Sequence, residues 1–356
     1  MKTLFFCNLI PLKTGAFETL LATIGAEFAK AGDEFVVVFG GAPIAPVAEA
    51  LKANGVRWLV LPGWADGPGR EHAWRFVLPA VALVRRERPD VAVVHFGNEL
   101  PTLAASLLVR LGGGPQPHWV WQQDQQIRDP GRLGRHVSRI RVLAAGGVFG
   151  EIYHAKACWL RRSGIPKMGT WFGSRDLAGG GCLYDIGVHV LDLCLYVIDN
   201  FEPVSAYGAT YTKFGNRGLG HGGWGKSENS GVPFEVEDFA SGLIKFSNGC
   251  TVSLDVTWAR HAEANDRVEV ELYGTEAGGH VYANKVFRKD STLGAHYTVE
   301  NSKVTTPFPH KDRFHNFINH LHGTEDLCVT MEQALVVQRI LDALAESART
   351  GGSVQL

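Results

Sequence analysis

Three consecutive glycines that lead into a long apolar segment, residues 179–198, constrain the fold more than any other stretch of the sequence. Apolar side chains recur there at helical spacing, which predicts a helix with a buried stripe: Ile186, Val190, Leu193 and Val197. Further apolar residues widen the stripe until the helix is apolar almost all round, and such a helix is buried in a larger domain. Gly187 leaves room for a ligand near the start of this helix, because it has no side chain.

Polar residues interrupt this apolar helix on one face only. Asp185, His189 and Asp192 follow one another at spacings of four and three residues, which place them on the same side of a helix. Burying such groups costs several kcal/mol unless they are paired or face a polar cavity. One interpretation is that Asp185 caps the helix and His189 is a satisfied core histidine. For the set as a whole we favour an active site.

Length, charge and cysteine usage narrow the class of protein. The 356 residues predict two domains, and a net charge of -1 gives no support for binding to nucleic acid or to an anionic membrane. The six cysteines are scattered without a CxxC pair, so we expect reduced thiols in a cytoplasmic protein and no zinc or disulfide framework. We interpret the apolar residues 3–12 as a first strand, not a signal peptide, and expect no run long enough to span a membrane.

Short apolar segments alternate with helical patterns over residues 1–147. The expected strands are 3–8, 34–39, 56–61, 90–96 and 117–121, and the expected helices are 16–31, 45–54, 74–86 and 100–111. This alternation predicts a doubly wound, Rossmann-like parallel sheet that binds ligands at the carboxyl ends of its strands. The first strand-to-helix turn contains no GxGxxG. Its Gly15 is a weak sign of a phosphate or sugar site, and a simple loop glycine is at least as good an interpretation.

The pattern changes near Gly146 and Gly147, so we expect domains over residues 1–147 and 148–356. The Asn248-Gly249 pair marks a hairpin turn between two alternating strands. Strands dominate this half, and two helices close the chain. The expected strands are 151–159, 203–213, 237–246, 251–259, 267–273 and 280–282, and the expected helices are 311–322 and 330–349.

The first half resembles the N-terminal domain of the GT-B retaining glycosyltransferases. The similarity covers roughly the first 140 residues and lies in the segments LFFCNLIPLKTGAFE, RRERPDVAVVHFGNELP and WVWQQDQQIRDP. In that fold the first domain receives the acceptor, and a second Rossmann-like domain holds the sugar nucleotide. Nothing after residue 150 has the pattern of that second domain, so we expect the machinery for a glycosyl donor to be missing.

The second half resembles the substrate domain of the Gfo/Idh/MocA oxidoreductases over about 200 residues. The similarity lies in GEIYHAKACWLRRSGIP, GTWFGSRDLAGGGCLYDIGVHVLDL, EDFASGLIKFSNG and LDALAESARTGGSVQL. It implies an α+β domain in which helices cover one face of a large, mostly antiparallel sheet. The other face of that sheet often forms a homo-oligomer. The resemblance also implies a sugar or polyol as the substrate and NAD or NADP as the cofactor.

Residue roles follow from the same resemblance. Asp185 and His189 match the acid/base pair of the family, in which the imidazole takes the proton of a sugar hydroxyl while hydride moves to a nicotinamide; imidazole titrates near neutrality, as this role requires. Asp192 and Trp171 would contact the substrate. The segment with Trp159, Arg161 and Arg162 matches one near the cofactor in some members, and an exposed strand end is an equally good interpretation of these residues. Gly15 would lie at the nucleotide.

Two features of the family are missing from this sequence. The GxGxxG after the first strand is absent, and the fifth strand runs into Trp121-Gln122-Gln123-Asp124, where the family has a catalytic lysine. The chain thus has the pattern of two halves from different families joined near residues 142–148. Three functions follow from this pattern: an NAD(P)-dependent sugar oxidoreductase, which we favour, a non-catalytic protein that binds sugar or forms oligomers, and a relative of the glycosyltransferases.

Overall fold

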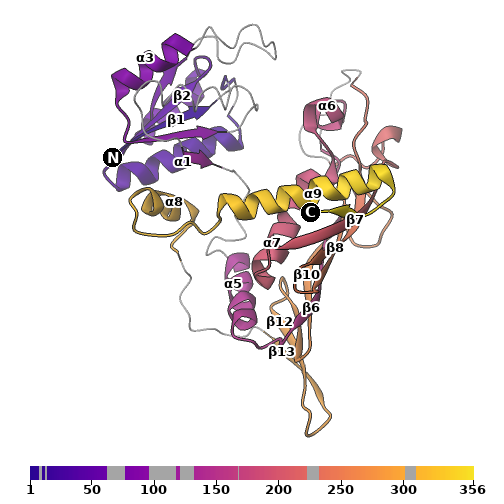
Figure 1. Cartoon of the computed structure of the whole chain (residues 1–356). Coiled ribbons are helices and arrows are strands. Elements are labelled where there is room, and N and C mark those ends of the chain that lie inside the picture. Colours follow the sequence, from indigo (N-terminus) through magenta and orange to yellow (C-terminus); the bar gives the residue numbers. More distant parts are fainter. Residues whose placement is uncertain are drawn as a thin grey trace. The chain divides into compact units, whose positions relative to one another are not determined.

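The computed structural model of the chain describes residues 1–7, 10–12, 14–61, 77–95, 118–120, 132–166, 168–222, 232–300 and 310–356 (Figure 1). The chain forms two compact units. The first is Met1–Gln122 with Asp312–Met331, and the second is Gln123–Lys311 with Glu332–Leu356. The units do not divide at the expected position, 147/148. Residues 123–147 belong to the second unit, and residues 312–331 belong to the first.

The first unit is a parallel sheet of five strands in the order β3-β2-β1-β4-β5, which confirms the predicted doubly wound arrangement. Its strands are β1 (Lys2–Cys7), β2 (Glu34–Phe39), β3 (Arg57–Val60), β4 (Val91–His95) and β5 (His118–Val120). Its helices are α1 (Ala16–Lys30), α2 (Ala45–Ala53), α3 (Val77–Glu87) and α8 (Arg313–Leu321). The helix expected over residues 100–111 and the strand ends at 96–99 and 122–124 lie outside the described residues.

Continuous apolar strands explain why this sheet is covered on both faces. In β2, Val36 and Val38 belong to one buried cluster, while Val37 and Phe39 belong to the cluster on the opposite face. The late helix α8 joins the second of these clusters through Ile318, which is why a C-terminal segment completes an N-terminal unit.

The second unit is built on a nine-stranded sheet in the order β13-β12-β11-β10-β6-β9-β8-β7-β14. Its neighbours are antiparallel except for β6 and β9, which run parallel. This confirms the expected large, mostly antiparallel sheet. The strands are β6 (Ile152–Arg161), β7 (Pro203–Tyr211), β8 (Phe239–Phe246), β9 (Thr251–Thr257), β10 (Asp266–Gly274), β11 (Ala277–His280), β12 (Lys285–Lys289), β13 (His296–Glu300) and β14 (Val354–Gln355).

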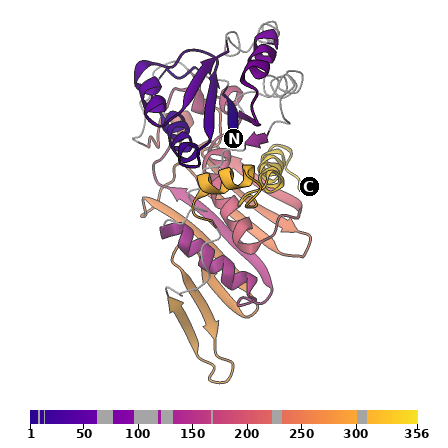
Figure 2. The same ribbon diagram turned by 90° about the vertical axis from the view of Figure 1, so that its left-hand side faces the viewer.

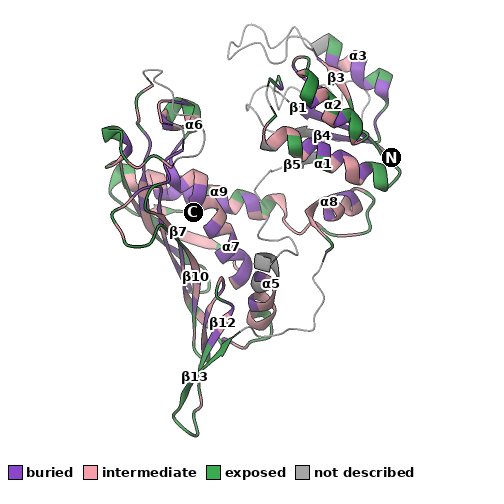
Figure 3. Cartoon of the chain, turned by 180° about the vertical axis from the view of Figure 1, so that it is seen from behind, coloured by how far each residue is buried: buried purple, intermediate pink, exposed green. Residues whose placement is uncertain are grey.

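Three helices, α5 (Arg132–Ala145), α7 (Val188–Ile198) and α9 (Met331–Thr350), lie along one face of this sheet (Figures 1 and 2). Alternate strand residues meet them in a single core, in which the buried layer lies between sheet and helices (Figure 3). The backbone N–H of Gly208 in β7 donates to the buried hydroxyl of Ser347 in α9 at 2.9 Å, which ties this helix closely to the sheet.

A helix and a hairpin of this unit are among the elements that the sequence did not predict. Helix α5 has many basic residues that obscure its short apolar stripe, Val137 and Ile140, and the structure shows that it packs against α7. The hairpin of β12 and β13 extends from the end of the sheet with most of its residues exposed (Figure 2), so it lacks the alternation by which half-buried strands are predicted.

Among the described residues, one helical stretch, Arg175–Ile198, is long and apolar enough to cross a membrane by length and composition. This corrects the expectation that no such run exists. The stretch is largely buried inside the unit, as the core helix of a globular protein is, so by itself it is weak support for a membrane span.

Candidate active site

The helix predicted from the sequence starts with a π-helical turn, Leu183–Gly187, and continues as α7. A buried carboxylate from another segment caps its start: Glu237 Oε1 accepts hydrogen bonds from the backbone N–H groups of Gly181 at 2.7 Å and of Leu183 at 3.1 Å. Burial raises the pKa of the Glu237 carboxyl group. The helix is therefore capped by Glu237, not by Asp185, and turns of this π type occur frequently at functional sites.

Asp185 lies within the π-helical turn and is half-buried. Its Oδ2 accepts a hydrogen bond from the indole Nε1–H of Trp258 at 2.8 Å. Trp258 directly follows β9, is only 1% exposed, and packs edge-on against Phe234 with ring centroids 6.4 Å apart. One carboxylate oxygen of Asp185 is thus fixed by a buried indole while the side chain keeps access to solvent.

His189 follows on α7 and is also half-buried, so it is not a sealed core histidine. Its ring centroid lies 6.1 Å from that of Trp159 on β6. The indole Nε1–H of Trp159 donates to Asp266 Oδ1 at 3.0 Å, and the guanidinium carbon of Arg161 lies 4.6 Å from the Trp159 ring centroid. An aromatic ring therefore borders the imidazole near the carboxyl end of β6, and the cation of Arg161 lies over that ring.

The remaining residues predicted for the site have different surroundings. Asp192 lies on α7, half-buried, beyond His189. Trp171 is half exposed in a short 3-10 turn, where its ring stacks on Phe172 at a centroid distance of 4.0 Å. Arg162 is exposed, and its Nη1 donates to the backbone carbonyl of Glu263 at 3.3 Å. Trp159 lies beside His189 and Arg161 lies over the Trp159 ring, whereas the guanidinium group of Arg162 is hydrogen-bonded to the backbone at Glu263.

Several residues that shape the site were not predicted. The carboxylate of Asp238 accepts hydrogen bonds from three consecutive backbone N–H groups, those of residues 213–215. Its backbone carbonyl accepts a hydrogen bond from the backbone N–H of Trp258. With its neighbour Glu237 it fixes both the start of the site helix and the strand end that carries Trp258. In the sequence, an adjacent Glu-Asp pair before an apolar strand is the only available signal.

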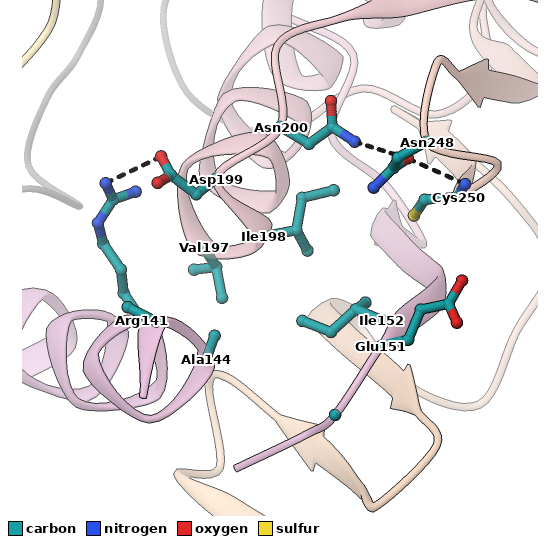
Figure 4. A pocket seen from close by; sticks show the side chains of 12 residues that line it. Arg141, Ala144, Glu151, Ile152, Val197, Ile198, Asp199, Asn200, Asn248 and Cys250 are labelled. Carbon is teal, nitrogen blue, oxygen red and sulfur yellow. Dashed lines mark hydrogen bonds and ion pairs between the residues drawn. The ribbon is translucent and has the colours of Figure 1, made fainter. Parts of the chain in front are cut away.

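A cavity of about 240 Å³ lies at the opposite end of α7, beside α5 and the start of β6 (Figure 4). Its rim includes the ion pair of Arg141 with Asp199, 3.0 Å apart, and the hydrogen bond from Asn200 Nδ2 to Asn248 Oδ1 at 3.1 Å. Neither Asp185 nor His189 lines it. The cavity is therefore separate from the candidate active site.

In the first unit, the turn after β1 leads to the N-terminus of α1, where Gly15 is the N-cap. Glu18 Oε2 accepts a hydrogen bond from the backbone N–H of Gly15 at 2.9 Å, so a carboxylate lies at this helix N-terminus. The side chain of Ile10 lies against Gly41, just beyond β2. Within the described residues, no group of three or more His, Cys, Asp or Glu side chains is arranged to hold a metal ion.

Comparison with known proteins confirms the expected resemblance of the second half. Residues 137–278 match the family model of the GFO/IDH/MocA C-terminal domain. The chain is 31% identical over 227 residues to D-glucoside 3-dehydrogenase of Escherichia coli (strain K12), covering 63% of this chain and 62% of that protein. It is 35% identical over 126 residues to a putative UDP-kanosamine synthase oxidoreductase subunit of Amycolatopsis mediterranei (strain S699), which is 35% of each chain. The chain thus spans less than two thirds of the length of these relatives.

Solved structures share the fold along the whole chain. A putative oxidoreductase from Thermotoga maritima superposes with a TM-score of 0.61 at 17% identity, covering 100% of both chains. Levoglucosan dehydrogenase in complex with NADH and levoglucosan superposes with a TM-score of 0.62 at 16% identity, covering 100% of this chain and 99% of that one. These likenesses establish the fold: a Rossmann-like parallel sheet followed by a large, mostly antiparallel sheet.

Proposed function

We propose that the chain is an oxidoreductase that oxidises a hydroxyl group of a sugar or polyol, with NAD or NADP as the hydride acceptor. The observation that carries the proposal is the placement of Asp185 and His189, which share one helix, are both half-buried, and are bordered by two tryptophans. The similarity to D-glucoside 3-dehydrogenase and the fold shared with levoglucosan dehydrogenase support the same class of reaction.

The proposed chemistry of the chain's own residues is the removal of one proton. His189 is the base that accepts the hydroxyl proton, since a neutral imidazole nitrogen is both an acceptor and titratable near neutral pH. Asp185, with Oδ2 fixed by Trp258, offers its second oxygen to the same substrate or to the imidazole. The walls formed by Trp159 and Trp258 limit the access of water to this proton transfer.

Further contacts to a sugar are proposed from the surroundings. The exposed ring of Trp171, stacked on the half-buried Phe172, suits the apolar face of a pyranose. Gly173 in the same turn approaches Phe234, which packs on Trp258. Asp192 would accept a hydrogen bond from a second hydroxyl group. Trp159 and Arg161 are proposed to lie at the cofactor, a role for which the exposed Arg162 is less suited.

The first unit fits a dinucleotide in its topology but not in its phosphate contacts. Its parallel sheet and following helix have the arrangement that binds such cofactors. The helix N-terminus that would hold the pyrophosphate instead has the carboxylate of Glu18 bonded to Gly15, and the turn contains a single glycine. This geometry disfavours the expected role of Gly15, and no residue of the described turn is assigned to the phosphates.

The same observation supports a second candidate, a non-catalytic protein that binds a sugar through the second unit. A carboxylate at the phosphate position weakens dinucleotide binding by repulsion, and without a hydride acceptor the pair Asp185 and His189 would only hydrogen-bond a ligand. The resemblance of residues 1–140 to glycosyltransferases stays a prediction.

We also propose that a second copy of the chain covers the open face of the nine-stranded sheet. That face carries large apolar side chains on the neighbouring strands β7 and β8, namely Tyr207 (54% exposed), Tyr211 (45%) and Leu243 (47%), and it carries Tyr273 (37%) on β10 farther along the sheet. Exposed apolar side chains gathered in this way mark interaction surfaces. A cytoplasmic location is proposed from the cysteines, all six of which are free.

Cofactor titration and turnover test the main proposal. The full-length chain is titrated with NADH and NADPH up to millimolar concentration by nicotinamide fluorescence. It is then assayed with NAD(P) and a panel of methyl hexopyranosides. We expect binding and turnover that His189→Ala abolishes, while the control His296→Ala, on the exposed strand β13, keeps both. Sugar binding without dinucleotide binding would favour the non-catalytic candidate.

A further inference from the structure

The residue that follows β9, Trp258, presents a buried indole to Asp185. Trp258 is 1% exposed and its Nε1–H has only one partner among the described residues, Oδ2 of Asp185 at 2.8 Å. An indole N–H is a donor only, and when buried it needs an acceptor. The bond therefore constrains both side chains.

Trp258 is itself held firmly from several directions. Its backbone N–H donates to the carbonyl of Asp238 at 2.9 Å. The hydroxyl of its neighbour Thr257 donates to the carbonyls of Asp238 and Ala259, both at 2.8 Å. The ring of Phe234 packs edge-on against the indole. A side chain with so few degrees of freedom can define the position of the group it binds.

Apart from the hydrogen bond from Trp258, little fixes the direction of the Asp185 side chain. It is half-buried in a π-helical turn, in which side-chain directions differ from those of an α-helix, and the cap from Glu237 holds only the backbone at the start of that turn. Oδ2 is occupied by the indole, and no described residue donates to Oδ1. One oxygen is thus fixed and the other is left for a ligand.

We infer that Trp258 is a positioning residue that fixes the carboxylate of Asp185 so that Oδ1 meets the substrate hydroxyl or the imidazole of His189. This inference rests on the proposed function, because it gives Trp258 a role in the same proton transfer. Independently of turnover, the chemical environment of the indole N–H of Trp258 should depend on the charge of Asp185.

The test combines indole NMR with kinetics on the full-length chain. The indole ¹H–¹⁵N resonance of Trp258, one of nine tryptophans, is identified as the one lost in Trp258→Phe. We expect Asp185→Asn to shift it, while Asp199→Asn at the far end of α7 does not. Trp258→Phe should lower kcat by about 10-fold to 100-fold, the effect of one lost hydrogen bond to a charged group, with KM for a methyl hexopyranoside changed little.

Controls separate this role from damage to the fold and from failure of the proposed function. Trp58→Phe, in the other unit, loses an indole without touching the site, and thermal unfolding shows whether each variant folds. An unshifted resonance in Asp185→Asn, or wild-type kcat in Trp258→Phe, would overturn the inference. If the wild-type chain has no turnover, the proposed oxidation fails, and the indole shift alone then supports or overturns the fixing of Asp185 by Trp258.

Discussion

Oε1 of Glu237 and the backbone nitrogen of Gly181 lie 2.7 Å apart, in a contact that joins the segment before β8 to the start of the site helix. The backbone N–H of Cys182 also donates to the carbonyl oxygen of Glu237, at 3.0 Å. The two segments are therefore bonded through both side chain and main chain. This contact sets where the helix begins, and with it the positions of Asp185 and His189.

Gly181→Ala should disrupt the site. A Cβ atom at this position would lie 2.0 Å from the backbone carbonyl oxygen of Glu237, which is too close for any real contact. Because backbone must move, we expect a loss of about 2 kcal/mol or more in the free energy of unfolding of the second unit. Urea unfolding measures this, with Gly352→Ala as the control, since a Cβ there meets nothing within 4 Å. Equal stability of the two variants would contradict the structure.

Glu237→Gln should remove a pH dependence of stability. Burial raises the pKa of this carboxyl group above its ordinary 4.5 in the folded chain, so the folded state holds more protons than the unfolded state just above pH 4.5. The stability that Glu237 contributes is therefore complete below pH 4.5 and declines as the pH rises through the raised pKa.

Both N–H groups donate to the same oxygen, Oε1, so a glutamine amide can keep both bonds without the charge. In urea unfolding from pH 4.5 to neutrality, the free energy of unfolding of the variant should therefore rise relative to that of the wild type as the pH increases. A constant difference across that range would count against this prediction.

The stability that Glu87 contributes to the first unit should depend on pH in the opposite direction from that of Glu237. The hydrogen bond from Arg57, helped by Lys2 at 2.9 Å, lowers the pKa of the Glu87 carboxyl group to about 2. Its contribution is therefore complete above pH 4.5, its ordinary pKa, and is lost as the pH falls through about 2. We expect Glu87→Gln to cost about 1 to 2 kcal/mol at neutral pH, since Arg57 is partly exposed and screened by water. Additive effects of Glu87→Gln and Arg57→Gln would exclude this coupling.

Glu18→Gln should raise the affinity for NADH or NADPH. The amide can still accept the hydrogen bond from Gly15, but the negative charge at the N-terminus of α1 is gone. Interactions of a charge with a helix terminus are worth about 0.3 to 1 kcal/mol, so Kd should fall by about 2-fold to 5-fold. Fluorescence titration measures this, with the exposed Glu49→Gln on α2 as the control. An unchanged Kd would place the phosphates elsewhere.

Leu243→Glu should convert an oligomer into a monomer if the open sheet face joins two copies. Leu243 lies opposite Tyr207 on the neighbouring strand, and both are exposed. A carboxylate buried between two copies would lack a partner, which is strongly unfavourable. Light scattering after gel filtration reports the mass. The control is Leu335→Glu, which is similarly exposed but lies on α9, on the helix side of the sheet.

The two kinds of sheet and the helix that carries the site could be predicted from the residue pattern alone. Continuous apolar runs such as 35–39 are typical of a strand buried on both faces, and the apolar helix after the three glycines has the pattern of an internal helix. The spacing of Asp185 and His189 was readable because side chains on one helix are placed by local geometry alone.

The surroundings of Asp185 and His189, in contrast, depend on how distant segments of the chain pack together. Trp159 lies on β6 and Trp258 directly follows β9, and Glu237 caps the site helix through a hydrogen bond from Gly181, which lies 56 residues earlier in the sequence. The sequence also did not predict that α5 belongs to the second unit and α8 to the first. This depends on which apolar surfaces pack together in the folded chain. Periodicity reports which face of an element is buried, but the partner that buries it is chosen by packing over the whole chain.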